Sequence, residues 1–287
     1  MSESDLAHLD AGNGPAVVLL HGYPFDRSMW REQIDFLSAH GYRVIAPDLR
    51  GFGETVAQTS VSEPSGSSHR RKSVTLKETN RTITTMADMA HDVAALMDEL
   101  EIADATICGL SMGGYVAFEF VHVFPARTRA LVLAGTRAPA DNEQEKQARA
   151  QQADQMMARG MGEVADATLR KLLAPRTLTE NPAVVAQVRE MILRADPKGA
   201  AAAQRGMAAR RNYSADLPGI SAPVLIIVGR QDPIRPVADA EFMHRSLSNS
   251  SLVIIEEAAH MTNMEQPEVF NRALFGFMEA LDNSAGG

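Results

Sequence analysis

The sequence contains a single cysteine, Cys108, among its 287 residues. An intramolecular disulfide and a cysteine-based metal cluster are therefore excluded, and we expect Cys108 to pack as a small hydrophobic side chain. Long apolar runs are missing too, because stretches such as 16–20 and 224–228 fall far short of the ~20 residues that a membrane span requires. Residues 1–10 are acidic and polar, so no secretory signal is indicated. These absences predict a soluble, cytoplasmic protein with no membrane partner.

Positive charge is also in short supply. The chain has 28 lysine and arginine residues against 36 aspartate and glutamate residues, which gives a formal net charge of −8 at pH 7. Because nucleic acids and anionic membranes are bound by clustered positive charge, neither is expected as a partner. The one basic run, at residues 70–72, is interpreted as a solvated cluster on a loop. The sequence carries no signal for an oligomeric state.

Short aliphatic runs alternate with segments of helical period, which predicts an α/β fold. The runs are too short for helices and lack the alternation of half-exposed strands, so we expect strands buried on both faces of a mostly parallel, doubly wound sheet. Residues 7–10 fit an additional antiparallel edge strand. The expected strands are 17–20, 43–46, 105–108, 130–133, 224–228 and 252–255, and the expected helices are 28–39, 86–101, 112–124, 236–247 and 267–281.

Two segments interrupt this alternation. Residues 137–216 contain no strand-like run and are punctuated by prolines, which predicts a helical cap inserted into a core formed by residues 1–136 and 217–287. Residues 54–82 are rich in serine and threonine and have no hydrophobic period, which predicts a long surface loop within the core. The cap methionines either line an apolar pocket or fill the interior of the cap; they are Met156, Met157, Met161, Met191 and Met207.

The segment Gly-Leu-Ser-Met-Gly at 109–113 lies between an expected buried strand and an expected helix. This context is typical of a nucleophile elbow, in which a sharp strand-to-helix turn exposes a serine hydroxyl and glycines relieve the crowded backbone. The alternative is a glycine-rich turn with a buried serine that has no chemical role. We predict that Ser111 is a catalytic nucleophile.

A serine nucleophile needs a base and an acid that orients the base, and in this kind of fold they follow in the chain order Ser, Asp or Glu, His. Asp232 follows the expected strand 224–228, and His260 follows the expected strand 252–255. Both positions place the side chains at the carboxyl ends of strands, so His260 is the predicted base and Asp232 the predicted orienting acid. The alternatives are a turn aspartate before Pro233 and a loop histidine.

The oxyanion hole is predicted from backbone N–H groups. Residues 21–24, His-Gly-Tyr-Pro, directly follow the expected strand 17–20, where this fold places one donor. We assign the N–H of Tyr23 to that role, because Pro24 has none, and the N–H of Met112 is the second predicted donor. His21 is predicted to have a structural role beneath the loop.

These motifs together resemble the α/β-hydrolase superfamily. The resemblance rests on residues 21–24, on Asp-Leu-Arg-Gly-Phe-Gly at 48–53, on the Ser111 elbow, on Gly-Arg-Gln-Asp at 229–232 and on Ala-His at 259–260. Serine at the elbow differs from the aspartate of haloalkane-dehalogenase-like members. The Gly-Leu-Ser-Met-Gly-Gly form, the cap placement and Asn-Met-Glu-Gln-Pro at 263–267 are similar to the enol-lactonase and small carboxylesterase group, with some N-acyl homoserine lactonases similar in plan.

The sequence therefore predicts a serine hydrolase that acts on small esters or lactones through an acyl-enzyme and needs neither metal nor other cofactor. The cap has many arginines; most are expected to be solvated surface charges, but one could pair with a carboxylate on the substrate. Among them are Arg137, Arg159, Arg170, Arg189, Arg205 and Arg210. The same machinery also supports perhydrolysis, as in haloperoxidase-like relatives, or C–C bond hydrolysis, and a non-catalytic ligand receptor on this fold is a further alternative.

Overall fold

The computed structural model describes residues 6–56 and 82–285. In this part of the chain, seven strands form one sheet in the order β1-β3-β2-β4-β5-β6-β7. β1 pairs with β3 in antiparallel orientation, and every other neighbouring pair is parallel, so the expected mostly parallel sheet is confirmed. The strands are β1 (His8–Ala11), β2 (Ala16–Leu20), β3 (Arg43–Pro47), β4 (Ala105–Leu110), β5 (Thr128–Ala134), β6 (Val224–Gly229) and β7 (Ser250–Ile255).

Burial of the strands follows their position in the sheet. All residues of β4 and β6 are buried, as the unbroken aliphatic runs predict. β7 is different, because most of its residues are partly exposed. It pairs only with β6 and forms an edge of the sheet, so the expectation that this strand is buried on both faces is wrong.

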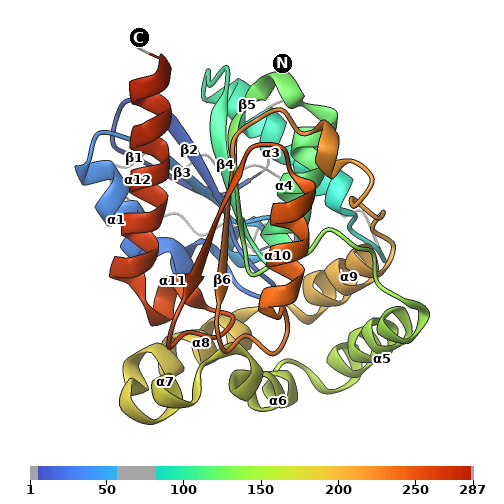
Figure 1. The fold of residues 1–287 in the computed structure, drawn as a ribbon. Coiled ribbons are helices and arrows are strands. Elements are labelled where there is room, and N and C mark those ends of the chain that lie inside the picture. Colours follow the sequence, from blue (N-terminus) through green and yellow to red (C-terminus); the bar gives the residue numbers. More distant parts are fainter. Residues whose placement is uncertain (1–5, 57–81, 286–287) are drawn as a thin grey trace, which may run out of the picture.

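Helices pack on both faces of the sheet. Figure 1 shows α1 and α12 together on one face and α3 and α4 on the other. The helix expected over 28–39 is divided, because Asp26 caps a 3₁₀ turn at Arg27–Trp30 and α1 begins only after it. The core helices are α1 (Arg31–Ala39), α2 (Gly53–Val56), α3 (Met86–Glu99), α4 (Met112–Val123), α10 (Val237–Ser246), α11 (Thr262–Glu265) and α12 (Pro267–Ala285).

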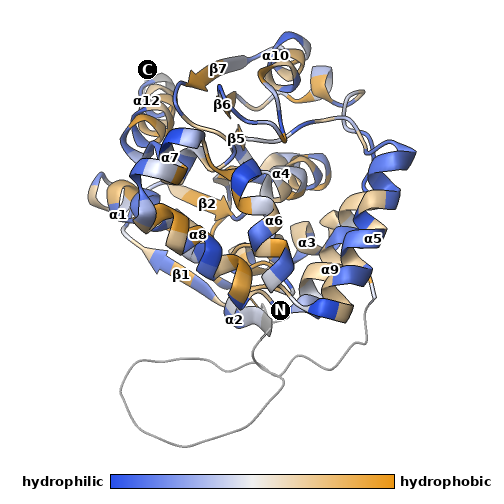
Figure 2. Ribbon diagram, turned by 90° about the horizontal axis from the view of Figure 1, so that it is seen from below, coloured by the Kyte–Doolittle hydropathy of each residue, from blue (hydrophilic) through white to orange (hydrophobic). Residues whose placement is uncertain are grey.

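Five helices lie between β5 and β6 in the described chain, and we call them the cap helices. Pro175, Pro182 and Pro197 each occupy the first position of a helix, where a missing N–H costs nothing. In Figure 1 α5 to α8 gather at one end of the sheet, and Figure 2 views the molecule from that end, with hydrophilic residues along the outer side of α5. The division into core and cap domains stays a prediction. The cap helices are α5 (Glu143–Arg159), α6 (Gly162–Leu172), α7 (Pro175–Glu180), α8 (Pro182–Arg194) and α9 (Pro197–Ala208).

The expected loop over 54–82 lies mostly outside the described residues, which exclude 57–81. Its first residues are not loop, because 54–56 complete the short helix α2. The carboxylate of Asp48 accepts the N–H of Glu54 at 2.8 Å, and the Thr55 hydroxyl donates to the Asp48 carbonyl at 2.7 Å. These hydrogen bonds stabilise the helical turn of α2. The sequence there has no hydrophobic period, so the turn was not predicted. In the same described ranges, no helix is long and apolar enough to cross a bilayer.

Candidate active site

Ser111 lies in the turn between β4 and α4, with φ 55° and ψ −108°. A side chain at positive φ is unfavourable, so the surrounding structure must hold the turn in place. The Ser111 N–H donates to the Ala134 carbonyl at 2.9 Å, and the Thr136 hydroxyl donates to the Ser111 carbonyl at 2.9 Å. The end of β5 and the segment that follows it therefore hold Ser111 in this conformation.

The two glycines that flank the turn are required by close backbone contacts. A Cβ atom on Gly109 would lie 2.2 Å from the Gly113 carbonyl oxygen, and one on Gly113 would lie 2.1 Å from the Leu20 carbonyl oxygen. Both distances are far below a van der Waals contact, so neither position admits a larger residue without movement of the backbone. This is the physical basis of the pattern from which the elbow was predicted.

Asp232 and His260 form a buried pair. His260 Nδ1 lies 2.7 Å from Asp232 Oδ2, and the two side chains are 3% and 0% exposed. The other carboxylate oxygen, Oδ1, accepts the N–H groups of Ile234 at 2.8 Å and Arg235 at 2.9 Å. Both carboxylate oxygens of Asp232 are thereby hydrogen-bonded, which suits an ionised carboxylate that receives the Nδ1 proton of a neutral imidazole.

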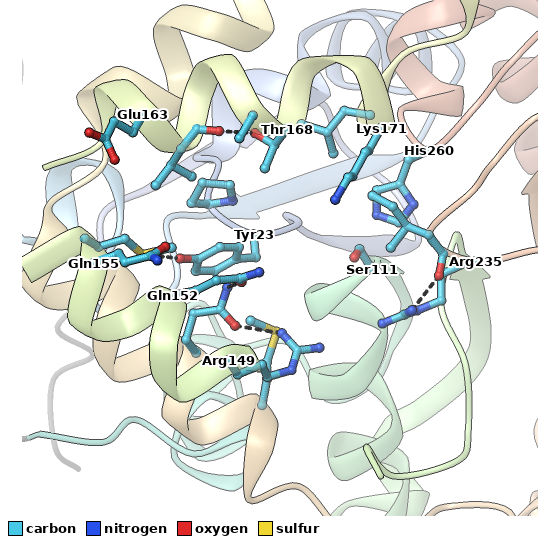
Figure 3. A pocket seen from close by; sticks show the side chains of 18 of the residues that line it. Tyr23, Ser111, Arg149, Gln152, Gln155, Glu163, Thr168, Lys171, Arg235 and His260 are labelled. Carbon is cyan, nitrogen blue, oxygen red and sulfur yellow. Dashed lines mark hydrogen bonds between the residues drawn. The ribbon is translucent and has the colours of Figure 1, made fainter. Parts of the chain in front are cut away.

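A cavity of about 440 Å³ opens between the sheet and the cap helices, and its lining includes Ser111, His260 and Tyr23. Because β2, β4, β6 and β7 are parallel, the segments that follow them lie together at the carboxyl ends of the strands. Figure 3 shows the Ser111 hydroxyl and the His260 ring facing the same space. The structure thus brings the three predicted triad residues together, and their catalytic roles stay a prediction.

The two predicted oxyanion donors flank the elbow. Tyr23 lines the cavity, and Met112 is the first residue of α4. Within the described residues, neither N–H donates to a protein acceptor, so both are available to a substrate oxygen. His21 is buried and held at both ring nitrogens: the Leu49 N–H donates to Nε2, and Nδ1 lies against the Gly22 carbonyl, each at 2.9 Å. Burial lowers the pKa of His21, which agrees with a neutral structural imidazole.

Three cationic side chains line the cavity, and the sequence singled out none of them by position; they are Arg149, Lys171 and Arg235. Arg235 is only 8% exposed; it donates to the Tyr115 hydroxyl and to the Ile234 carbonyl, both at 2.5 Å, and its Nε has no partner among the described residues. Lys171 points into the cavity from α6 (Figure 3). Helical periodicity could place Lys171 on α6, but only tertiary packing decides that this side faces Ser111.

Nearby arginines change the pKa of Tyr115. Burial raises the pKa of its phenol, but the positive charges of Arg235, Arg210 and Arg149 outweigh burial and lower the pKa below its ordinary value. The Arg210 guanidinium lies 4.1 Å from the centre of the Tyr115 ring, a cation–π contact. The Tyr115 phenol, which lines the cavity, thus lies close to several positively charged side chains.

The cap arginines considered from the sequence lie elsewhere. Arg137 and Arg210 bind Asp141 at 2.8 and 2.7 Å, and Arg149 binds the same carboxylate at 2.5 Å. None of these six lines the cavity, but another cap arginine, Arg149 of α5, does. Whether a cap arginine binds a substrate carboxylate stays a prediction. Among the cap methionines, Met156 and Met207 do line it, whereas Met157 is half exposed.

The described residues contain no group of three or more His, Cys, Asp or Glu side chains arranged to hold a metal ion. Cys108 lies buried in β4 beneath the elbow, and burial raises the pKa of its thiol. It therefore packs as a small hydrophobic residue, as expected.

Comparisons with known proteins show the family of the chain. Residues 15–267 match the family described as alpha/beta hydrolase fold. The chain is 30% identical over 265 residues to 3-oxoadipate enol-lactonase 2 of Acinetobacter baylyi, covering 92% of this chain and 89% of that protein. A solved structure of a thermophilic esterase from Thermogutta terrifontis is 37% identical, with a TM-score of 0.85 over 96% of this chain and 93% of that one. The enol-lactonase from Burkholderia xenovorans LB400 is 26% identical, with a TM-score of 0.81 over 96% of both chains.

Proposed function

Because the chain belongs to the alpha/beta hydrolase fold family, we propose that it hydrolyses small carboxylic esters or lactones through an acyl-enzyme formed on Ser111. The observation that carries the proposal is the buried Asp232–His260 pair at 2.7 Å, whose imidazole opens into the cavity that contains Ser111. Similarity to proteins named esterase and enol-lactonase supports the same reaction class.

In the proposed reaction, Ser111 Oγ attacks the carbonyl carbon while its proton passes to His260 Nε2. The carbonyl oxygen becomes an oxyanion that accepts hydrogen bonds from the N–H groups of Tyr23 and Met112. Collapse of this intermediate expels the alkoxide, which takes the proton from His260, and the acyl group stays on Ser111. Water then attacks with His260 as base and releases the acid; for a lactone, alcohol and acid leave as one molecule.

The charge of the cavity supports substrates that carry an anionic group. Arg235 is buried and has no carboxylate in hydrogen-bond or ion-pair contact among the described residues, although a buried cation is normally paired. Glu163, the one acid among the described residues that line the cavity, is exposed and pairs with Arg159 at 3.2 Å. A substrate carboxylate would supply the missing partner. A higher kcat/KM for the p-nitrophenyl monoester of succinate than for the neutral butyrate ester is the expected result.

Replacement of the nucleophile tests the reaction. We expect Ser111→Ala to lower kcat for p-nitrophenyl butyrate and for a γ-lactone by about 10⁴-fold or more, because the hydroxyl proposed to form the acyl-enzyme is removed. Ser38→Ala, whose hydroxyl donates only to the Asp35 carbonyl at 3.3 Å in α1, is the matched control and should keep full activity. Wild-type turnover by purified Ser111→Ala would show that the proposed mechanism is wrong.

A further inference from the structure

The carboxylate of Glu265 joins the loop of His260 to the cap helices. Glu265 ends α11 and is 8% exposed. Its Oε1 accepts the N–H of Ala259, the residue before His260, at 2.8 Å. Its Oε2 accepts the N–H of Ala174 and the hydroxyl of Thr177, both at 2.6 Å, from the start of α7. Burial raises the pKa of this carboxyl group, whereas the N–H groups of Ala259 and Ala174, the Thr177 hydroxyl and a positive charge on His260 favour its ionised form. The two backbone N–H groups can only donate, so they suit a carboxylate that accepts on both oxygens.

A second connection runs in parallel with the first. The carbonyl of Leu172, the last residue of α6, accepts the N–H groups of His260 and Met261, both at 3.1 Å. The side chains of Leu172 and of its neighbour Lys171 line the cavity. The same short cap segment therefore lines the cavity and is hydrogen-bonded to the backbone of the predicted base.

Two ion pairs between the cap helices and the core are of a different kind. Arg194 pairs with Asp26, and Arg176 pairs with Glu257, but Arg194, Arg176 and Glu257 are each more than half exposed. Exposed ion pairs contribute little, and salt screens them. Glu265, by contrast, places a buried charge and short hydrogen bonds directly beside the His260 backbone.

We propose that Glu265 is a positioning residue for His260 in the reaction inferred above, on which this proposal rests. Its hydrogen bonds join the Ala259–His260 backbone and the Leu172–Thr177 segment into one rigid unit. The imidazole therefore keeps its position when substrate binds against the cap side of the cavity. Its negative charge also stabilises the imidazolium that forms during acyl transfer. Among the described residues, the charged groups near this imidazole are Asp232 from the β6–α10 loop and Glu265 from α11, together with Lys171 from α6 and Arg235 from the β6–α10 loop, which line the same cavity.

Glu265→Gln tests both parts of the proposal. The amide oxygen can serve either Ala259 or the pair Ala174 and Thr177, and the NH₂ group then faces a donor on the other side. With p-nitrophenyl butyrate we expect kcat to fall by about tenfold to a hundredfold with KM within about twofold, because binding groups are untouched while the base is displaced. We expect the acid limb of the kcat/KM profile to move to lower pH by about half a unit or more, since a negative charge near the imidazolium is lost.

Thr177→Val is the matched control, because it removes one bond to Oε2 and leaves the charge and the Ala259 bond in place. Its acid limb should coincide with that of the wild type. Equal loss of melting temperature in Glu265→Gln and Thr177→Val, with unchanged pH profiles and kcat, would overturn the proposal in favour of a purely structural tie.

Two further variants keep the outcome decisive. If Glu265→Gln does not fold, Glu265→Asp keeps the charge and shortens its reach: a reduced kcat with an unmoved acid limb supports the proposal, and a wild-type kcat overturns it. Ser111→Ala is assayed alongside. An active Ser111→Ala rejects the proposed reaction itself, whereas an inactive Ser111→Ala with a wild-type-like Glu265→Gln rejects only the role of Glu265.

Discussion

Asp232→Asn offers a sharp test of the site, because the structure fixes how the new amide must lie. Oδ1 of Asp232 accepts two backbone N–H groups, from Ile234 and Arg235, and Oδ2 faces His260 Nδ1. The asparagine oxygen will therefore take the Oδ1 position, and its NH₂ will point at the imidazole. His260 Nδ1 must then accept, which moves the ring proton to Nε2, where the proton of Ser111 has to arrive.

The expected loss of activity follows from the free-energy cost of turning the asparagine amide the other way. To restore the productive tautomer, the amide must flip and set its NH₂ against both backbone donors, each of which loses a buried acceptor. Such losses cost about 1–3 kcal/mol each, so about 2–6 kcal/mol separates the two arrangements. At 1.36 kcal/mol per tenfold change, kcat/KM should fall by about 30-fold to 10⁴-fold. The fold should persist, because two of the three hydrogen bonds remain.

The assay is hydrolysis of p-nitrophenyl butyrate between pH 6 and 9, with a thermal melt of each variant. Asp216→Asn is a suitable control, since Asp216 pairs with Arg211 near the surface and lies outside the cavity lining. If Asp232→Asn keeps its activity within about threefold of the wild type, then the hydrogen bond to His260 does not set the tautomer, and the reasoning fails.

The remaining predictions concern charge. Arg235→Gln should lower kcat/KM for the succinate monoester by about tenfold or more relative to the butyrate ester, because a charged hydrogen bond contributes about 1.5–3 kcal/mol; equal losses for both esters would contradict an anion site. Burial disfavours the charge of Asp141, but Arg149 and Arg210 outweigh it and lower its pKa to about 2 from 3.8. Because the folded-state pKa is the lower one, this stabilisation, about 2 kcal/mol, is present above about pH 4 and is lost as pH falls towards about 2. In urea unfolding, the stability gap between wild type and Asp141→Asn should shrink across that interval, and a gap independent of pH would refute it.

Much of the fold was predictable because its signals are local. The unbroken aliphatic runs of β4 and β6 indicated burial on both faces, and the cap prolines stand at the helix starts where their geometry favours them. The chain order of Ser111, Asp232 and His260 then indicated which strand ends to examine.

What escaped prediction depends on contacts between distant segments. The exposure of β7 follows from its place at the edge of the sheet, which no local pattern encodes. The place of Arg235 in the cavity was not predicted, because only the tertiary fold brings its guanidinium to Tyr115, whereas its backbone belongs to the Asp232 turn. Glu265 was visible in a sequence run, yet its partners at 174, 177 and 259 come from separate elements.

The position of the cap helices bears on how such a protein can acquire new substrates. They leave the sheet after β5 and return before β6, and these strands are neighbours, so helices can be exchanged or lengthened there without altering strand register. The exchange is not free, however, because the Leu172 carbonyl holds the His260 backbone. In a chimera that receives the cap of another protein, the hydrogen bonds from the cap to the His260 backbone are replaced as well. Grafts that retain residues 172–177 and vary only α5, α8 and α9 are therefore the ones in which specificity can change while turnover survives.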